Sequence, residues 1–246
     1  MSNFFYVVFY QPILNLLIFF YNIIPGHSIG LAIIIMTVLI KLFLWPLSKQ
    51  SIKSQKSLQD LQPKVDELKK KYANNKEAMG KEMIELYKKE KVNPFSSCLP
   101  LLIQLPFFWA VFLVFRDGLS GKSLNLVYSF IDQPAAINSI FLGIIDLAKP
   151  NVILAVLAGL AQFWQAKMMN TKQAAIKDQE AKDENMMAIM NKQMLYLMPV
   201  LTIFIGLTFP SGLALYWLIT TVLTILQQFY LFKNENQKVI DQKSIN

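Results

Sequence analysis

A single lysine lies inside a long apolar run, and it is the residue most able to do chemistry in this chain. The run extends from Gly30 to Ser48 (GLAIIIMTVLIKLFLWPLS) and contains Lys41, with Thr37 one helical turn before it. At ~1.5 Å of rise per residue, the run is long enough to cross most of a ~30 Å hydrocarbon layer. A lysine well inside such a segment costs about 2.5–3.5 kcal/mol, so its ammonium group needs water, protein or the membrane surface beside it.

Two interpretations of Lys41 are open from the sequence. Ser48 follows it after only ~10 Å of helix, so the aliphatic stem is able to extend along the helix and place the charge at the membrane surface. Alternatively, Lys41 faces a water-filled cavity that opens to the cytoplasm. We favour the cavity, because the other apolar runs also carry polar residues.

Polar side chains recur in these other runs at spacings that put them on one helical face. Tyr216, Thr220 and Thr224 follow one another at intervals of four residues, and Gln227 continues the stripe. Singly, each is explained by a hydrogen bond between helices, which contributes ~0.6 kcal/mol on average. Together they predict a shared hydrophilic groove that binds clients. Its expected residues are Lys41, Thr37, Gln104, Gln162, Gln165, Tyr216, Thr220 and Thr224.

The composition excludes most catalytic and metal chemistry. With one histidine (His27) and one cysteine (Cys98), an internal disulfide is impossible and a Cys/His zinc site is not expected. The apolar runs hold no Asp or Glu, which intramembrane aspartyl proteases and proton-coupled pumps use. No HExxH, phosphate-binding loop or GxGxxG motif is present. We therefore expect a protein that binds or conducts rather than an enzyme, with no metal and no cofactor.

Hydropathy and run length predict an all-α polytopic membrane protein. Hydrophobic residues make up 54% of the 246 residues, and the mean hydropathy is +0.38. The expected five-helix core covers 29–232 and includes a cytoplasmic helical hairpin over 49–93, and a short cytoplasmic tail follows over 233–246. The five spans are predicted at 29–48, 95–116, 151–169, 193–209 and 212–232.

The N-terminal residues 1–28 are apolar but interrupted by polar residues. Gln11, Asn15 and Asn22 recur on one helical face, and Pro25-Gly26 then turns the chain. This pattern favours an amphipathic helix lying in the outer interface, and a further spanning helix is the alternative.

The distribution of basic residues orients these elements in the membrane. With five spans, the segments 49–93, 167–192 and 233–246 share one side. Of the 24 basic residues, Arg116, Lys122 and Lys149 fall on the other side. The positive-inside rule then places the hairpin and the C-terminus in the cytoplasm and the N-terminus outside. The net charge of +8 fits anionic lipid better than nucleic acid in such a protein.

Four strings carry a resemblance to a known family. They are residues 30–48, 61–72 (LQPKVDELKKKY), 90–112 (EKVNPFSSCLPLLIQLPFFWAVF) and 209–228 (FPSGLALYWLITTVLTILQQ). In order and spacing they resemble the YidC/Oxa/Albino family of membrane protein insertases. The resemblance implies a five-helix core around a hydrophilic groove that is open to the cytoplasm and to lipid. The family's groove cation is usually arginine, and the matching position here is Lys41, which is a departure.

The resemblance also implies a function and a set of partners. It implies insertion and folding of integral membrane proteins, with Lys41 drawing hydrophilic client segments into the groove. We expect a bacterial member in the cytoplasmic membrane, active as a monomer, without the large extracytoplasmic domain of many members. Expected partners are nascent membrane proteins and membrane lipids, with the ribosome and the Sec translocon as further candidates and no direct nucleic-acid partner.

Two points stay open beside this resemblance. The hairpin is a candidate docking surface, although a plain solvated helix pair explains its charge equally well. Its candidate residues are Lys64, Lys69, Lys70, Lys71, Lys88 and Lys89. A channel or small-solute transporter with Lys41 as an anion site is the alternative function, and the shortage of internal repeats and charge rings counts against it.

Overall fold

The protein is almost entirely helical, as the sequence predicts. The computed structural model describes residues 3–93, 99–118, 124–169 and 193–245, so Cys98, Lys122 and the polar segment 170–192 lie outside the described residues. The α-helices are α1 (Asn3–Phe5), α2 (Gln11–Ile23), α3 (Ile29–Phe43), α4 (Trp45–Lys71), α5 (Lys76–Lys89), α6 (Leu99–Leu113), α7 (Val152–Met169), α9 (Met198–Thr208) and α10 (Ser211–Ile245). Short π-helical stretches cover Tyr6–Tyr10, Val114–Gly118 and Gln193–Leu197, and a 3-10 turn covers Leu124–Leu126.

Within the described residues, three helical stretches are long and apolar enough to cross a membrane. They are Tyr6–Ile23, Val152–Met169 and Ser211–Lys233, and the bent pair α3–α4 counts as a fourth if it is taken as one span. The stretch Leu195–Thr208 is apolar but shorter. These lengths and compositions agree with a polytopic membrane protein. The tail predicted over 233–246 continues α10 as helix up to Ile245.

Helix α3 ends earlier than hydropathy predicts, because a proline follows it. The predicted span reached residue 48, but α3 stops at Phe43 and α4 starts at Trp45 after a bend of 68°. Pro46 has no N–H with which to continue the hydrogen-bond ladder of α3, and its fixed φ suits the first turn of a new helix. We call this bend, at Leu44, the elbow.

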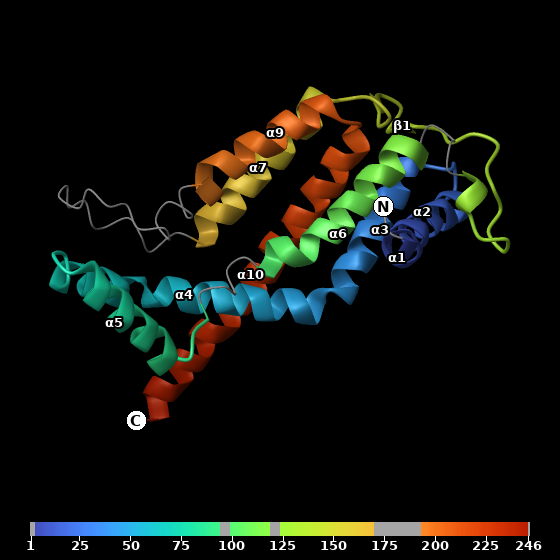
Figure 1. Ribbon diagram of the computed structural model, residues 1–246. Coiled ribbons are helices and arrows are strands. Elements are labelled where there is room, and N and C mark those ends of the chain that lie inside the picture. The colour runs from blue at the N-terminus through green and yellow to red at the C-terminus, as the bar shows by residue number, and fades with distance from the viewer. Residues whose placement is uncertain (1–2, 94–98, 119–123, 170–192, 246) are drawn as a thin grey trace.

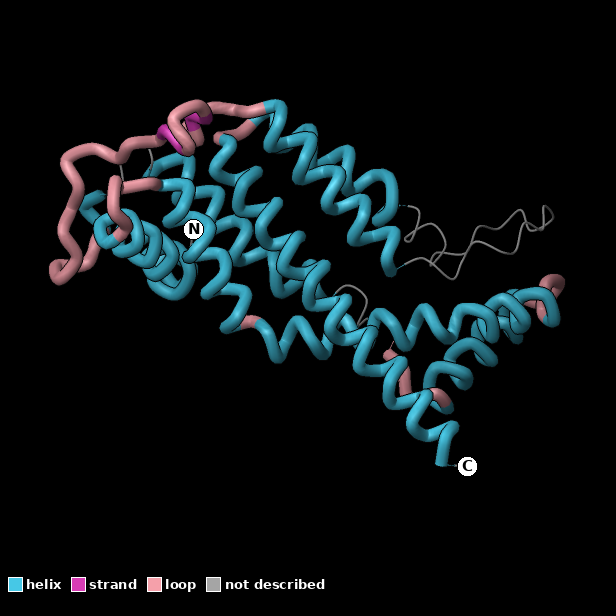
Figure 2. The backbone as a smooth tube through the Cα atoms, turned by 180° about the vertical axis from the view of Figure 1, so that it is seen from behind, coloured by secondary structure: helices cyan, strands magenta, loops and turns pink. Residues whose placement is uncertain are grey.

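The elbow sends α4 across the ends of the other helices. Figures 1 and 2 show α10 crossing α4 and continuing beyond it, while α5 folds back beside α4. Helix α4 buries Leu58, Leu61 and Val65, which belong to the apolar seam of the predicted hairpin. No side chain of α5 is fully buried, so α4 provides the main attachment of the hairpin to the rest of the protein.

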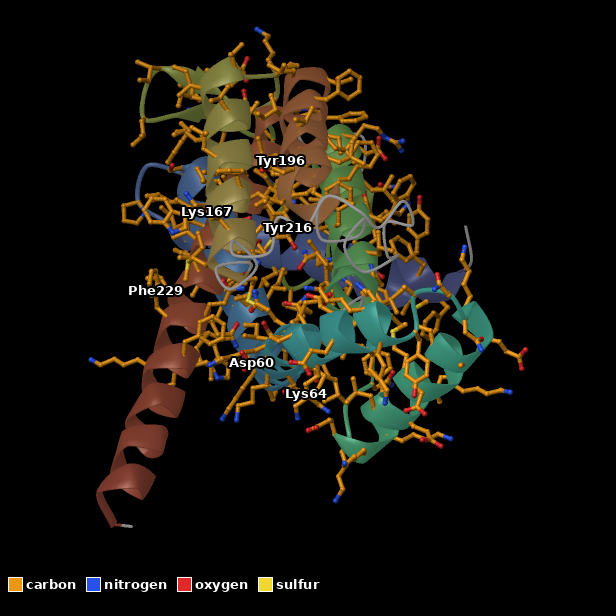
Figure 3. The ribbon with its side chains drawn as sticks, turned by 90° about the vertical axis from the view of Figure 1, so that its left-hand side faces the viewer. Asp60, Lys64, Lys167, Tyr196, Tyr216 and Phe229 are labelled. Atoms are coloured by element: carbon orange, nitrogen blue, oxygen red, sulfur yellow. The ribbon has the colours of Figure 1, made fainter. Side chains whose placement is uncertain are left out.

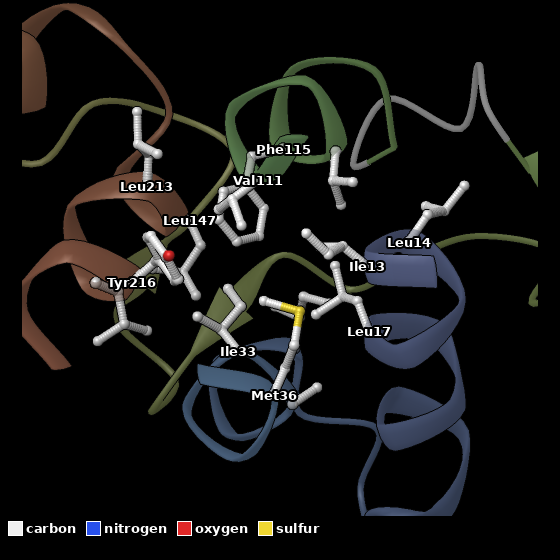
Figure 4. Close-up of a cluster of buried hydrophobic side chains, with 14 of the residues drawn as sticks. Ile13, Leu14, Leu17, Ile33, Met36, Val111, Phe115, Leu147, Leu213 and Tyr216 are labelled. Carbon is white, nitrogen blue, oxygen red and sulfur yellow. The ribbon is translucent and has the colours of Figure 1, made fainter. Parts of the chain in front are cut away.

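The hydrophobic core lies where α2, α3, α6 and α10 meet. Figure 4 shows Leu17 of α2, Ile33 and Met36 of α3, Val111 of α6 and Leu213 of α10 converging there. All five are at most 1% exposed. This apolar packing holds α3 and α10 next to each other, which fixes the surroundings of Lys41.

Helices α7 and α9 form a second, closely packed layer. They lie side by side in Figures 1 and 2, with α10 next to them. Two glycines permit this approach: a Cβ on Gly159 would lie 2.4 Å from Ile203, and a Cβ on Gly206 would lie 2.7 Å from that of Ala155. Small residues at a helix interface bring backbones close enough for dispersion contacts within a membrane.

The segment between α6 and α7 covers one end of the bundle. It contains an antiparallel hairpin of β1 (Ile140–Phe141) and β2 (Ile145–Asp146), where the sequence predicts only short interfacial pieces. Phe141 lies against α3 so closely that a Cβ on Gly30 would come within 2.0 Å of its ring. The backbone N–H groups of Ser211 and Gly212 donate to the carbonyls of Lys149 and Leu147, which satisfies the first donors of α10.

Candidate functional site

Lys41 lies in the last turn of α3 and points toward α10. Its Nζ donates a hydrogen bond to Thr224 Oγ1 at 2.8 Å and a longer one to Ser48 Oγ at 3.5 Å. Thr224 in turn donates its hydroxyl proton to the carbonyl of Thr220 at 2.7 Å. The ammonium group is therefore held by neutral hydroxyls.

The hydrogen bonds continue from Ser48 to a buried glutamine. Ser48 Oγ donates to Gln227 Oε1 at 2.8 Å, and Gln227 Nε2 donates to the backbone carbonyl of Trp45 at 3.3 Å. Gln227 is 1% exposed. We refer to the side chains of Lys41, Ser48, Thr224 and Gln227 as the Lys41 network; each donor in it points away from the cation, which strengthens the neighbouring bonds.

No carboxylate of the described residues forms an ion pair with Lys41. The described ion pairs involve Lys64, Lys69, Lys81, Arg116 and Lys149. A half-buried cation that is bound by hydroxyls alone has weaker partners than a carboxylate would provide, because charge-assisted bonds between opposite charges are about twice as strong. An acidic group that reached Lys41 would gain this difference.

A second polar contact joins α6 to α10 above the Lys41 network. Gln104 Nε2 donates to Tyr216 Oη at 2.6 Å, and Tyr216 is 2% exposed. Figure 3 shows Tyr216 within the bundle, with Asp60 and Lys64 of α4 below it. Thr220 lies between the two contacts on the same face of α10, so this face connects them.

The remaining expected groove residues are placed differently. The hydroxyl of Thr37 is 1% exposed and donates to the carbonyl of Ile33 in its own helix at 2.6 Å, so it takes no part in the Lys41 network. Gln162 of α7 accepts a hydrogen bond from Thr202 of α9. Gln165 is half-buried one turn further along α7. The structure thus brings Lys41 and Thr224 together and pairs Gln104 with Tyr216, whereas Gln162 belongs to the α7–α9 contact.

Sequence reasoning missed Ser48 as a site residue and left Gln227 out of the expected groove. Ser48 was taken as the end of an apolar run, but it lies seven residues after Lys41, beyond the elbow, and the bend brings it back toward the ammonium group. Gln227 continues the spacing of Tyr216, Thr220 and Thr224, so this spacing was the available signal.

Part of the hairpin lysine set is used within the hairpin itself. Lys64 of α4 forms an ion pair with Glu90 just after α5, and its hydrogen bond and charge hold the pKa of Glu90 below its ordinary value. Lys69 pairs with Asp66 at 3.1 Å, and the Lys71 ammonium group lies 5.2 Å from the ring centre of Tyr72. The exposed lysines of the set are Lys64, Lys70, Lys71, Lys88 and Lys89.

Comparison with known proteins identifies relatives along most of the chain. The family described as "60Kd inner membrane protein" matches residues 19–238. A protein of Fusobacterium nucleatum named "Membrane protein insertase YidC" is 34% identical over 206 residues, which cover 84% of this chain and 87% of that protein. Relatives with the same name from Geobacter metallireducens and Geotalea daltonii are 38% and 39% identical over 91% of this chain.

The relatives differ in length. The chain spans 37% of the length of the Geobacter metallireducens and Geotalea daltonii proteins, whereas it spans most of the Fusobacterium nucleatum protein. The matched region contains α3, α6, α7, α9 and the part of α10 that carries the Lys41 network. The chain therefore belongs to the 60Kd inner membrane protein family, the YidC/Oxa family that its four sequence strings resemble.

Proposed function

We propose that this protein inserts integral membrane proteins into the bacterial cytoplasmic membrane and assists their folding. In this proposal Lys41 is the first binding point for an acidic group in a client's hydrophilic segment. The observation that carries the proposal is the half-buried Lys41 ammonium group, bound to the hydroxyls of Thr224 and Ser48 and unpaired with any described carboxylate. The names of the relatives support the same class of function.

The chemistry of the site favours an acidic client group over other ligands. A carboxylate replaces the weak 3.5 Å contact to Ser48 with a charge-assisted bond, and the attraction is larger beside apolar helices than in water. Lysine is a compact charge with three rotatable donors, so it is able to keep Thr224 while it binds the newcomer. Binding of this kind is reversible, which suits a site that must release its client.

The polar residues of the bundle define the path of the client's hydrophilic segment. We expect a groove lined by Lys41, Thr224, Thr220, Tyr216 and Gln104 that opens to the cytoplasm. Water in the groove shortens the hydrocarbon distance that the segment has to cross. The client's apolar segment then enters lipid, driven by ~25 cal/mol per Å² of apolar area removed from water.

The hairpin of α4 and α5 is the proposed receiving surface on the cytoplasmic side. Its exposed lysines Lys70, Lys88 and Lys89 suit acidic surfaces of the ribosome, of the Sec translocon or of anionic lipid. Membrane protein clients and lipids are the partners that the family membership supports most directly.

Substitution of Lys41 tests the proposal. Lys41→Ala is expected to reduce insertion of a client with an acidic short outer segment at least about tenfold in a depletion strain and in proteoliposomes, which corresponds to ~1.4 kcal/mol. Lys41→Arg keeps the charge and is expected to retain insertion. Lys167→Ala removes an exposed lysine in the last turn of α7 and serves as the matched control. Full insertion activity of Lys41→Ala would refute the proposal, and anion flux through liposomes that depends on Lys41 would favour the channel instead.

A further inference from the structure

The Lys41 network joins both sides of the elbow to one face of α10. Before the bend, Lys41 of α3 donates to Thr224. After the bend, Ser48 of α4 and the Trp45 carbonyl bind Gln227. Thr224 and Gln227 lie three residues apart, so they occupy neighbouring positions on the same face of α10.

This arrangement fixes the direction in which α4 leaves the membrane core. Pro46 removes the backbone hydrogen bond that would hold α3 and α4 in line, so the elbow angle depends on side-chain contacts. Lys56 of α4, whose Nζ lies 4.7 Å from the ring centre of Phe232, adds one more contact to α10. Because α5 buries no side chain fully, the direction of α4 also sets the position of the hairpin.

We propose that the Lys41 network is a latch that couples an acidic client group at Lys41 to the angle of the elbow. This inference rests on the proposed function of Lys41. The carboxylate takes the Nζ donor that Ser48 shares in the unloaded protein, and Ser48 then loses its link to α3. The hold of Gln227 on α4 weakens with it, and the hairpin swings away from its resting position. Ser48 and Gln227 are thus positioning residues that report occupancy of the groove to the cytoplasmic surface.

The neighbour of Gln227 supplies a matched control. Gln228 is fully buried, and neither atom of its amide has a hydrogen-bond partner among the described residues. Replacing Gln227 with Leu breaks two links to α4, whereas the same replacement at Gln228 breaks none. The two variants differ by one position on the same helix, so both remove one buried amide.

Distance measurements between the hairpin and the core test the latch. Spin labels at Glu85→Cys on α5 and Leu160→Cys on α7, both exposed positions, are introduced in a Cys98→Ser background in lipid nanodiscs. The probe is a peptide with one apolar helix preceded by two Asp residues and carrying a photoreactive group, and the same peptide with two Asn residues is its control. Electron paramagnetic resonance gives the distance distribution between the labels.

The unloaded protein is expected to give a narrow distribution. Gln227→Leu and Ser48→Ala are expected to widen it about twofold, because the elbow then populates several angles. Gln228→Leu is expected to match the unsubstituted protein. The Asp peptide is expected to widen the distribution of the unsubstituted protein, and the Asn peptide is expected to leave it unchanged.

Separate results overturn the latch and the proposed function. A narrow distribution for folded Gln227→Leu or Ser48→Ala refutes the latch, and the milder Ser48→Ala decides if the other variant does not fold. If the Asp peptide cross-links to α3 and the distribution stays narrow, the latch is refuted while the proposed function stands. If the Asp peptide does not cross-link to α3, the proposed function of Lys41 fails, and the client trigger of the latch fails with it.

Discussion

Lys41 combines the two interpretations that its sequence position allows. Its ammonium group reaches toward Ser48 beyond the elbow, as a lysine that extends to the membrane surface does. It also remains half-buried between α3 and α10, where Thr224 is its shortest hydrogen-bond partner. A cation in this position is accessible from the elbow side and is partly shielded from water, which is the combination that the proposed client binding requires.

Asp146 is a second charged residue with a defined role, at the opposite end of the bundle. Ser139 Oγ donates to its carboxylate at 2.6 Å, the Ala148 N–H donates at 3.1 Å, and Lys149 Nζ lies 3.2 Å away. The hydrogen bond from Ser139, followed by those from Ala148 and Lys149, holds the pKa of Asp146 below its ordinary value. The charged form of Asp146 therefore stabilises the β-hairpin that covers α3.

This lowered pKa predicts an acid-dependent stability. Because the folded pKa of Asp146 lies below the unfolded value of ~3.9, its contribution is fully present above that value and is lost as the pH falls through the folded pKa. Asp146→Asn is expected to lower the melting temperature at pH 7 and to flatten its decline between about pH 5 and pH 3. Thermal unfolding of the detergent-solubilised protein, followed by fluorescence across this pH range, measures both effects.

Asp132 provides the control for this prediction. Its side chain is exposed and makes no hydrogen bond to the described residues, although its backbone carbonyl accepts one from Asn22. Asp132→Asn is expected to keep both the melting temperature and its pH profile. An Asp146→Asn variant that shows the same pH profile as Asp132→Asn would contradict the assigned role of Asp146.

At the scale of elements, the contact between α7 and α9 depends on a glycine. A Cβ on Gly206 would lie 2.7 Å from Ala155 Cβ and 3.0 Å from Ala155 Cα, and the second of these atoms is backbone. Gly206→Leu therefore forces the two helices apart and is expected to cost about 1–3 kcal/mol, as overpacking does in other cores. Heating in detergent followed by size-exclusion chromatography gives the loss of folded protein.

Leu207, the next residue on α9, is the matched control. It is 43% exposed and faces away from α7, so Leu207→Ala is expected to change the melting temperature little. Equal melting temperatures for Gly206→Leu and Leu207→Ala would show that the close approach of α7 and α9 contributes nothing to stability.

The sequence predicted the helices better than it predicted their ends and directions. A span has to be apolar over about 20 residues, so runs such as 151–169 stand out in the chain. The elbow was missed because Trp45 and Leu47 are as apolar as the residues of α3, and apolar composition carries no information about the direction of a helix axis. The β-hairpin was missed because its strands have two residues each.

The candidate site shows the same division between composition and tertiary contact. Lys41 was predictable, because a charge in an apolar run is costly wherever the run lies. The partners of the other polar residues were not predictable from spacing. A threonine within a helix often bonds to the carbonyl four residues before it, as Thr37 does with Ile33. The pairing of Gln162 with Thr202 depends on how α7 and α9 face each other.

At the scale of the whole molecule, the polar face of α2 is bound along its length to the segment that covers one end of the bundle. Gln11 and Asn15 donate to the Leu126 carbonyl at 3.2 Å, and Asn22 donates to the Asp132 carbonyl at 2.7 Å. Asn15 Oδ1 also accepts from the Tyr128 N–H at 2.6 Å. Figures 1 and 4 show α2 running across the direction of α3 rather than alongside it.

These contacts bear on whether residues 1–28 span the membrane. The stretch Tyr6–Ile23 is long and apolar enough to cross. However, Gln11 and Asn22 are separated by ~16 Å of helix, and both bind the same segment between α6 and α7. A helix that crossed the membrane would carry one of these residues far from a segment that lies at one surface. We therefore predict that α2 lies in the outer interface.

Cysteine labelling from each side of the membrane tests this prediction together with the orientation of the chain. In a Cys98→Ser background, Phe4→Cys and Ile23→Cys occupy exposed positions at the two ends of the N-terminal stretch. An impermeant maleimide is expected to reach both from outside the cell, because an interfacial helix keeps both ends on one side. Ala136→Cys is expected to react from outside and Lys81→Cys only from the cytoplasm, which calibrates the two sides. Labelling of Phe4→Cys from the cytoplasm and of Ile23→Cys from outside would instead establish a spanning helix, and the hydrogen bonds of Gln11 and Asn22 would then have to form at different depths of the membrane.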